Sequence, residues 1–321
     1  MRKSLVLLAG IVLFGLSCNK STSDEKMPEG DEPTATTRQC SSNDVLELQL
    51  KEDPSLQSRM NSIEDFTRQV IANPAQYRLE NGVVIIPVVF NVLYRTAAQN
   101  VSQAQLQSQI DVLNEDFAAT NADYNLTSTY NSVKSGNIAV RFELSTINRR
   151  STTKISWSTN DAMKKSAQGI APTTPTTKLN VWVCNMGGGI LGYAQFPGGS
   201  SATDGVVLDD NATGRTGTAA APFDKGRTAT HEVGHWLNLR HIWGDATCGT
   251  DQVGDTPTHN TANYGCPAAG HQSTCSGTPV EMTLNYMDYT DDACMYMFSL
   301  GQEARMLAVF AAGGPRNSFA Q

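Results

Sequence analysis

The order of patterns along the chain predicts an α/β (α+β) fold, in which a mixed sheet is covered by helices and followed by an irregular segment. A β-branched and aromatic run at 83–94 is typical of a buried strand. Apolar residues at helical spacing after Ser102 predict that a helix follows it. From Gly244 the periodicity is lost among Gly, Pro, Asp, Thr and Cys, and it returns only at 299–310. Alternating strands and helices indicate an α/β layer.

The remaining elements follow in chain order. An amphipathic helical unit is expected between Asn43 and Asn73, where apolar residues recur at helical spacing: Leu56, Met60, Ile63, Phe66 and Val70. Further strands are expected at four places: 137–144, 178–184, 191–196 and 205–209. The period changes from helical to strand-like near 74–82, and we place a domain boundary there.

Length and charge limit the classes of function. A chain of 321 residues with 40% apolar residues is long enough for one sizeable domain and a smaller appendage. The net charge is −7, and no run of Lys and Arg offers a basic surface to a phosphate backbone. The composition therefore argues against nucleic-acid binding.

The first residues predict export. Residues 1–18 combine a positively charged start, an apolar stretch and small residues before Cys18, as a signal peptide does. The sequence Gly15-Leu16-Ser17-Cys18 resembles a bacterial lipoprotein cleavage box, although Gly15 stands where Leu is most common. We predict a secreted or cell-envelope protein whose only membrane attachment is a lipid on Cys18; an ordinary secretory signal is the alternative. Residues 19–37 are polar and predict a disordered tether.

The strongest chemical signal is the sequence HEVGHWLNLRH at 231–241. Histidines four residues apart lie on one face of a helix, so His231 and His235 can bind one ion. His241 would lie roughly 9 Å further along a straight helix. The chain must therefore turn back, and Asn238 stands where a turn with positive φ is needed. Three imidazoles leave the fourth position of a zinc ion to water, and Glu232 is placed to take a proton from that water.

A structural zinc site is the alternative for these histidines. Such a site normally uses four protein ligands, often cysteines, and has no use for Glu232 beside the first ligand. Because three of the five histidines fall within this one motif, the catalytic interpretation is favoured.

The extended motif resembles that of the metzincins, and specifically the pappalysin family in its bacterial, cytophagalysin-like branch. The metzincin pattern HExxHxxGxxH has Gly where this chain has Asn238. The family also carries a methionine turn beneath the metal, and the sequence NYMDY at 285–289 fits it with Met287. The resemblance implies that Tyr289 lies near the zinc and hydrogen-bonds the oxyanion formed during hydrolysis. It extends from about residue 38 to 305.

The resemblance implies that the protein is a zinc-dependent endopeptidase with a metzincin-like zincin fold. The upper subdomain would hold a twisted mixed sheet and the active-site helix, and the lower subdomain would be irregular and disulfide-bonded. The edge strand of the sheet, for which 191–196 is the candidate, would pair with a protein or peptide substrate in extended conformation. There are two alternative functions. A catalytically silent binding protein on this scaffold would not keep Glu232. A zinc-dependent deaminase or amidohydrolase acting on small molecules would not carry its metal ligands on one helix.

Four cysteines fall in the irregular half: Cys248, Cys266, Cys275 and Cys294. Their number allows three pairings, and the spacing does not choose among them. The resemblance favours Cys248–Cys275 and Cys266–Cys294. A structural zinc held by four thiolates is the alternative, although no CxxC pair is present.

A calcium site is predicted in the same half. Asp251, Asp255 and Thr256 offer oxygen ligands of the kind that calcium uses. An ordinary solvated loop would have the same composition. The resemblance, whose members often carry calcium near this point, favours the structural calcium ion.

The last prediction concerns latency and rests on Cys40. This cysteine precedes the helical unit and has no evident disulfide partner, since Cys184 lies in a predicted buried strand. A thiolate can fill the vacant zinc position, and the Arg-x-Cys pattern looks like the inhibitory cysteine of pappalysin-type propeptides. We therefore predict an inhibitory propeptide at 38–80 and a catalytic domain at 81–321. Removal would follow a cut between Asn73 and Val83, beside Arg78.

Overall fold

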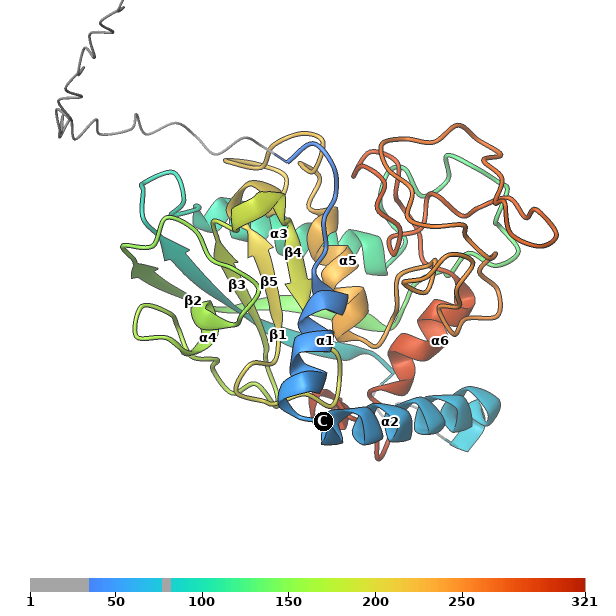
Figure 1. Ribbon diagram of the computed structural model, residues 1–321, viewed down its shortest axis with the longest axis horizontal. Coiled ribbons are helices and arrows are strands. Elements are labelled where there is room, and N and C mark those ends of the chain that lie inside the picture. Colours follow the sequence, from blue (N-terminus) through green and yellow to red (C-terminus); the bar gives the residue numbers. More distant parts are fainter. Residues whose placement is uncertain (1–34, 77–81, 321) are drawn as a thin grey trace, which may run out of the picture. The chain divides into compact units, whose positions relative to one another are not determined.

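The computed structural model describes residues 35–76 and 82–320. Its sheet has five strands in the order β2-β1-β3-β5-β4 (Figure 1). Their bounds are Val84–Tyr94 for β1, Val140–Ser151 for β2, Leu179–Cys184 for β3, Gly192–Ala194 for β4 and Val206–Asp209 for β5. Strands β2, β1, β3 and β5 are parallel, whereas β4 runs antiparallel to β5 at the edge. The expected mixed sheet is present, and the candidate substrate strand is an edge strand.

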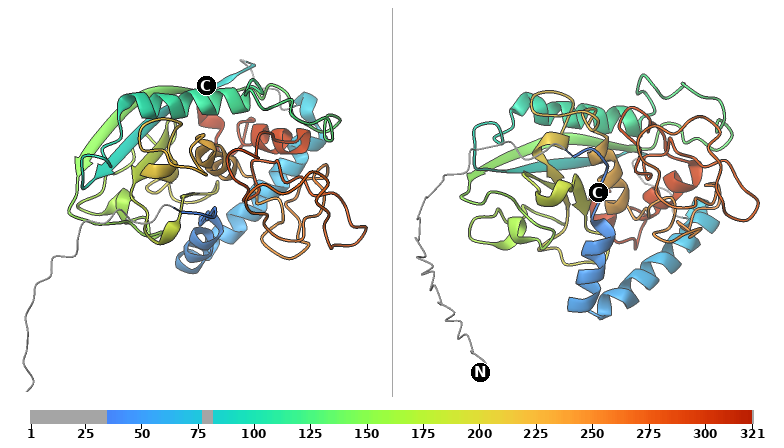
Figure 2. Two further views of the ribbon diagram at one scale, coloured as in Figure 1. Left: turned by 90° about the horizontal axis from the view of Figure 1, so that it is seen from above. Right: turned by 45° about the horizontal axis from the view of Figure 1, so that its top comes forward.

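Each face of the sheet carries its own hydrophobic cluster, because side chains alternate along the strands. Val206 and Leu208 join the cluster that includes α3 (Gln103–Phe117) and α5 (Arg227–Trp236). Val207 joins the other cluster, with Trp182. Figure 2 shows α3 lying along one face of the sheet. Helix α5, which carries His231 and His235, is thus held against β4 and β5 by the larger core.

Several elements differ from the sequence prediction, and β4 and α6 (Leu300–Ala308) are shorter than expected. Strand β2 was expected at 137–144 but begins at Val140 and continues to Ser151, because it pairs with β1 along its whole length. The short helix α4 (Ala162–Lys165) has no periodic signal and was not predicted. The end of β2 and the presence of α4 depend on pairing and packing with residues far away in sequence. A local sequence pattern carries no information about such contacts.

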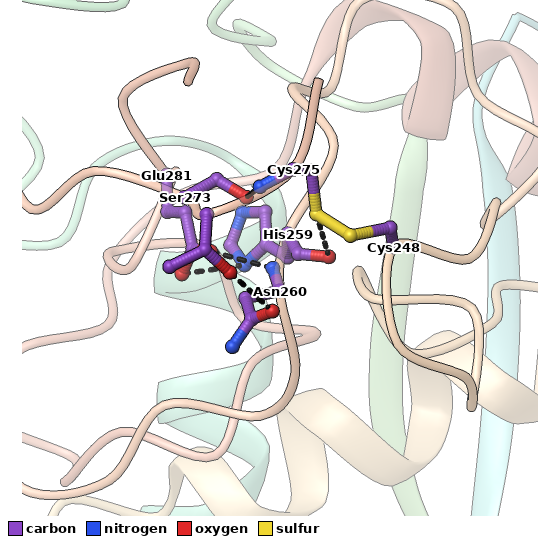
Figure 3. Close-up of a disulfide and its surroundings, with 7 residues drawn as sticks. Cys248, His259, Asn260, Ser273, Cys275 and Glu281 are labelled. Atoms are coloured by element: carbon purple, nitrogen blue, oxygen red, sulfur yellow. Dashed lines mark hydrogen bonds and ion pairs between the residues drawn. A yellow bond between two sulfur atoms is a disulfide. The ribbon is translucent and has the colours of Figure 1, made fainter. Parts of the chain in front are cut away.

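The chain after α5 is largely irregular, apart from α6 (Leu300–Ala308). Two disulfides cross-link it, Cys248–Cys275 and Cys266–Cys294. Figure 3 shows the first of these beside His259. Loops of 27 and 28 residues closed in this way contribute roughly 3–4 kcal/mol each in the chain-entropy picture.

We call residues 35–76 the arm. It contains α1 (Ser42–Glu52) and α2 (Ser55–Ala72), and it packs against β4 and α6. Short 3-10 turns complete the structure at Pro74–Gln76, Gly187–Gly189, Asp210–Ala212 and Asn317–Phe319. No helix among the described residues combines the length and apolar composition that crossing a membrane requires. The predicted signal peptide with Cys18, and the predicted cleavage position beside Arg78, lie outside the described residues.

Candidate metal centre

Helix α5 brings the first two histidines together. His231 and His235 are one turn apart, and their Nε2 atoms lie 3.2 Å from each other. The helix ends at Trp236, and Asn238 then takes a φ of 73°. This left-handed residue turns the chain back, so that Nε2 of His241 lies 3.1 Å from Nε2 of His235. The turn predicted at Asn238 is therefore present, and it brings the three imidazole rings together.

The second nitrogen of each ring fixes its orientation. Nδ1 of His231 lies 2.6 Å from the carbonyl oxygen of Tyr286, and Nδ1 of His235 lies 2.8 Å from that of Leu239. A carbonyl oxygen can only accept, so both Nδ1 atoms carry the proton and both Nε2 atoms present a lone pair. Burial lowers the pKa of His231 well below its usual range and that of His235 to about 3, which keeps the rings neutral.

This arrangement fits a metal ion. Short contacts between the Nε2 atoms of His231 and His235 are not hydrogen bonds, because neither atom has a proton to donate. Converging lone pairs repel each other unless a cation lies between them. Imidazole nitrogens together with a thiolate suit zinc. His231, His235 and His241 would hold it, and the sulfur of Cys40 completes a group whose donor atoms all lie within 4.8 Å of one another.

Cys40 reaches this group because the arm pairs with the edge strand. Cys40 and Gly192 form a parallel bridge, in which Ser41 N–H donates to the Gly192 carbonyl at 3.1 Å. Leu191 N–H donates to the carbonyl of Gln39 at 2.9 Å. The Sγ atom of Cys40 is not in a disulfide. The arm therefore occupies the strand edge expected to bind substrate.

Glu232 lies at the same place. Its Oε2 accepts a hydrogen bond from Ser42 Oγ at 2.9 Å and lies 3.4 Å from Cys40 Sγ. Burial raises the pKa of Glu232 to about 7. Gly192 makes room for this carboxylate, since a Cβ there would lie 3.1 Å from Glu232 Cγ and 2.7 Å from the Val207 carbonyl oxygen.

Met287 lies beneath α5 in the interior. A Cβ at Gly234 would lie only 2.5 Å from Met287 Sδ, so the helix and the methionine turn pack through a glycine. The centroid of the Tyr289 ring lies 4.9 Å from that of the His241 ring. The Tyr289 hydroxyl donates a hydrogen bond to the Cys40 carbonyl at 2.9 Å. Burial and the nearby acidic groups raise the pKa of Tyr289 well above its usual value, so its hydroxyl remains a donor.

Sequence reasoning missed several residues of this centre. Asp245 hydrogen-bonds Nδ1 of His241, and Trp243 stacks on the same ring at 4.4 Å. Ser42 bridges the arm to the site, because its Oγ also accepts from Ala194 N–H at 2.8 Å. An acidic residue four positions after the third histidine was a signal that could have identified Asp245. The bond made by Ser42 joins residues far apart in sequence, and no local pattern indicates it.

The buried side chain of Arg38 contacts Thr228 of α5 and three groups further along the chain, and we call this set of groups the Arg38 pocket. Its Nη2 lies 2.6 Å from Asp292 Oδ1, and both side chains are almost completely buried. The same guanidinium donates to the Thr290 carbonyl and to Thr228 Oγ1, each at 3.1 Å, and lies over the Phe223 ring. The pocket is thus built for a basic side chain, and it was not predicted from the sequence.

The predicted calcium ligands are already hydrogen-bonded, Asp251 and Thr256 to each other and Asp255 to the start of α6. Thr256 Oγ1 lies 3.0 and 2.9 Å from the two carboxylate oxygens of Asp251. Asp255 accepts from Ser299 Oγ at 2.7 Å and from Gly301 N–H at 2.8 Å, at the start of α6. Asp255 therefore stabilises the N-terminus of that helix, and calcium stays a prediction.

Comparison with known proteins agrees with this geometry. Residues 175–311 match the M43 peptidase family described as pregnancy-associated plasma protein-A. An extracellular metalloprotease of Verticillium alfalfae is 33% identical over 232 residues, which are 70% of this chain and 76% of that protein. One from Pyricularia oryzae is 34% identical, over 76% of this chain and 80% of that protein.

Solved structures extend the similarity to the arm. A mutant of promirolysin from Tannerella forsythia is 40% identical with a TM-score of 0.79, covering 88% of this chain and 97% of that one. Mature mirolysin in complex with a cleaved peptide is 44% identical with a TM-score of 0.71, covering 74% of this chain and 95% of that one. The chain is a metalloendopeptidase that belongs to the pappalysin family of metzincins.

Proposed function

We propose that the chain is a secreted zinc endopeptidase in which Glu232 is the general base. The observation that carries this proposal is the convergence of three imidazole lone pairs beside a buried carboxylate. A bound zinc ion would polarise the scissile carbonyl and make water more acidic. Glu232 would take a proton from the attacking water and pass it to the leaving amine as the C–N bond breaks. Tyr289 would donate its hydroxyl hydrogen bond to the carbonyl oxygen as negative charge develops there.

The test is hydrolysis of casein by the mature protein with and without Glu232→Gln. We expect the substitution to reduce turnover by at least a hundredfold, since it removes the buried carboxylate that would accept the proton of the attacking water. Glu143→Gln changes an exposed glutamate of β2 and serves as the matched control. Turnover within a few-fold of wild type in the Glu232 variant would show that Glu232 is not the general base. No casein hydrolysis by the parent protein would instead favour the alternative of a silent surface binding protein.

We further propose that the arm keeps the precursor inactive, with 38–80 as propeptide and 81–321 as catalytic domain. Three contacts support this: backbone pairing of the arm with β4, Cys40 Sγ among the histidines, and the Tyr289 hydroxyl bonded to the Cys40 carbonyl. Burial beside Glu232 raises the pKa of the Cys40 thiol, and a zinc ion at the imidazoles would favour the thiolate instead.

Latency is tested by comparing the precursor with its Cys40→Ala form. We expect the alanine variant to process itself faster and to cleave casein sooner. Cys184→Ala is the matched control, because Cys184 is the other free cysteine of the described chain and is buried in β3. Equal inertness of the Cys40 variant and the parent would show that another contact of the arm is the latch.

The Arg38 pocket favours a basic side chain beside the scissile bond of the substrate. When the arm leaves, Asp292 would face an open pocket already lined by the Thr290 carbonyl and the Phe223 ring. A substrate arginine could then make the contacts that Arg38 makes. Cleavage of a peptide library should show enrichment of arginine and lysine at one position next to the cut bond.

Two further features remain proposals. A structural calcium ion would be held by oxygens of the loop that carries Asp251, whose carboxylate is buried and whose pKa is raised to about 6 by that burial. Acylation of Cys18 would attach the precursor to a membrane until the arm is removed. Metabolic labelling with a fatty acid, compared with Cys18→Ser, tests the second.

A further inference from the structure

The arm makes a second contact with the catalytic domain, separate from the one at the metal centre. Helix α2 packs against α6 (Figure 1). Arg305 of α6 binds Glu64 of α2 through two parallel hydrogen bonds, from Nη1 to Oε1 at 2.9 Å and from Nη2 to Oε2 at 2.8 Å. The Arg305 side chain is 2% exposed and that of Glu64 is 19% exposed. The pair is therefore bidentate and largely removed from solvent.

The catalytic domain holds Arg305 in place for this contact. The Gln252 carbonyl accepts from Nη1 at 3.3 Å, and the Asn238 carbonyl lies 3.4 Å from Nη2. Both acceptors belong to the catalytic domain, so the guanidinium is oriented by groups that stay when the arm leaves. A fixed, planar guanidinium recognises a carboxylate with little loss of side-chain freedom.

Apolar contacts surround the ion pair. Val70 of α2 is buried against Ala308, the last residue of α6, and Ala311 just beyond it, with Phe66 packed beside them. Near the start of α2, Leu56 is buried in a cluster with Phe196, the residue whose ring lies 5.3 Å from His235. The contact is thus an amphipathic helix packed on the surface formed by α6, Ala311 and Phe196, which we call the α2 contact surface, and it includes one charged pair.

We propose that the α2 contact surface is a helix-docking site whose occupant is α2 of the same chain, and that it retains the arm after the chain is cut between residues 76 and 82. The proposal rests on the latency proposed above. It adds that maturation has two steps, scission and release. The cut protein stays latent at high concentration, and activity develops on dilution, because release then becomes an intermolecular dissociation.

The charge on α2 allows a matched test. Glu64 and Asp65 are neighbouring acids on one helix. Asp65 is exposed and pairs with the exposed Arg68, whose Nη1 also lies 3.9 Å from Glu64 Oε1. Glu64→Gln removes the charge that Arg305 binds, whereas Asp65→Asn removes a charge that faces solvent. Val70→Ala trims the apolar contact and leaves the charges unchanged. All three variants alter the arm alone, so the folding of the catalytic domain is not at stake.

The experiment uses the full precursor with a site-specific protease sequence placed at 77–81. Glu232→Gln prevents self-digestion, and Cys40→Ala removes the metal contact so that dissociation can be measured. After cutting, gel filtration at several dilutions follows whether the labelled arm elutes with the catalytic domain. This readout needs no peptidase activity, so it stands even if the catalytic proposal fails.

We expect the cut arm to co-elute. Glu64→Gln should weaken its retention about ten- to hundredfold, as loss of a charged bidentate contact does, and Val70→Ala about tenfold. Asp65→Asn should stay within about twofold of the parent. The proposal is overturned if the arm separates at once from the parent, or if all three variants are retained equally.

Discussion

The contact between Gly234 and Met287 allows a sharp test of how the metal centre is packed. Gly234 lies in the interior of α5, where alanine would stabilise a helix by about 0.5–1 kcal/mol. In this structure, however, the new Cβ would lie 2.5 Å from Met287 Sδ and 3.5 Å from Leu239 Cδ1. Overpacking of this kind costs about 1–3 kcal/mol. Gly234→Ala should therefore destabilise the protein by about 1 kcal/mol.

The sign should reverse when the sulfur is absent. In a Met287→Ala background the space is open, so Gly234→Ala should stabilise by about 0.5–1 kcal/mol, and the two substitutions should couple by about 1–3 kcal/mol. Urea unfolding of the four zinc-loaded proteins, all carrying Glu232→Gln, measures the cycle. For a domain of this size 1 kcal/mol corresponds to roughly 2–4 °C in Tm. Equal destabilisation by Gly234→Ala in both backgrounds would refute the packing argument.

Three other predictions follow from the site. Asn238→Gly should be more stable than Asn238→Ala by about 1 kcal/mol. Both substitutions remove a buried amide nitrogen that has no partner, but only alanine has a strained backbone at a φ of 73°. Equal urea midpoints of the two variants would contradict this. Asp292→Asn should reduce kcat/KM for arginine-containing peptides at least tenfold, with peptides that carry a neutral residue there as the control; an equal loss on both would mean that Asp292 is structural only. Removing calcium while zinc is kept should lower Tm, and more at pH 8 than at pH 5. Burial raises the pKa of Asp251 to about 6, so its carboxyl group is mostly protonated at pH 5. At pH 8 the buried carboxylate is charged and destabilises the folded protein unless a cation is bound. An unchanged Tm at both pH values would contradict the calcium proposal.

Much of the fold could be predicted because its signals are local. The strand at 83–94 and the helix after Ser102 are each set by residues that are neighbours in sequence, and the structure places β1 and α3 there. The length of β2 could not be predicted, since its last residues are a strand only because β1 lies alongside them. Helix α4 has too few residues to carry a period.

For the metal centre, the sequence alone determined which residues face one another. The spacing of His231 and His235 on one helix turn, and the need for a turn at Asn238, are consequences of backbone geometry that any fold must respect. The presence of Glu232 between the first two histidines follows from the same helix. The pairing of the four C-terminal cysteines was open on spacing alone, and the structure contains the pairs Cys248–Cys275 and Cys266–Cys294.

Only the tertiary structure decided what surrounds that centre. Arg38 binds Asp292 across 254 residues of sequence, and Glu64 binds Arg305 across 241. The Ser42 hydroxyl reaches Glu232 only because the arm pairs with β4. Such contacts have no sequence period, because they form between elements whose separation is set by the packing of the whole domain. Local backbone geometry therefore specified the metal ligands. Tertiary packing specified the Arg38 pocket, the contact of α2 with α6 and the position of Met287 beneath α5.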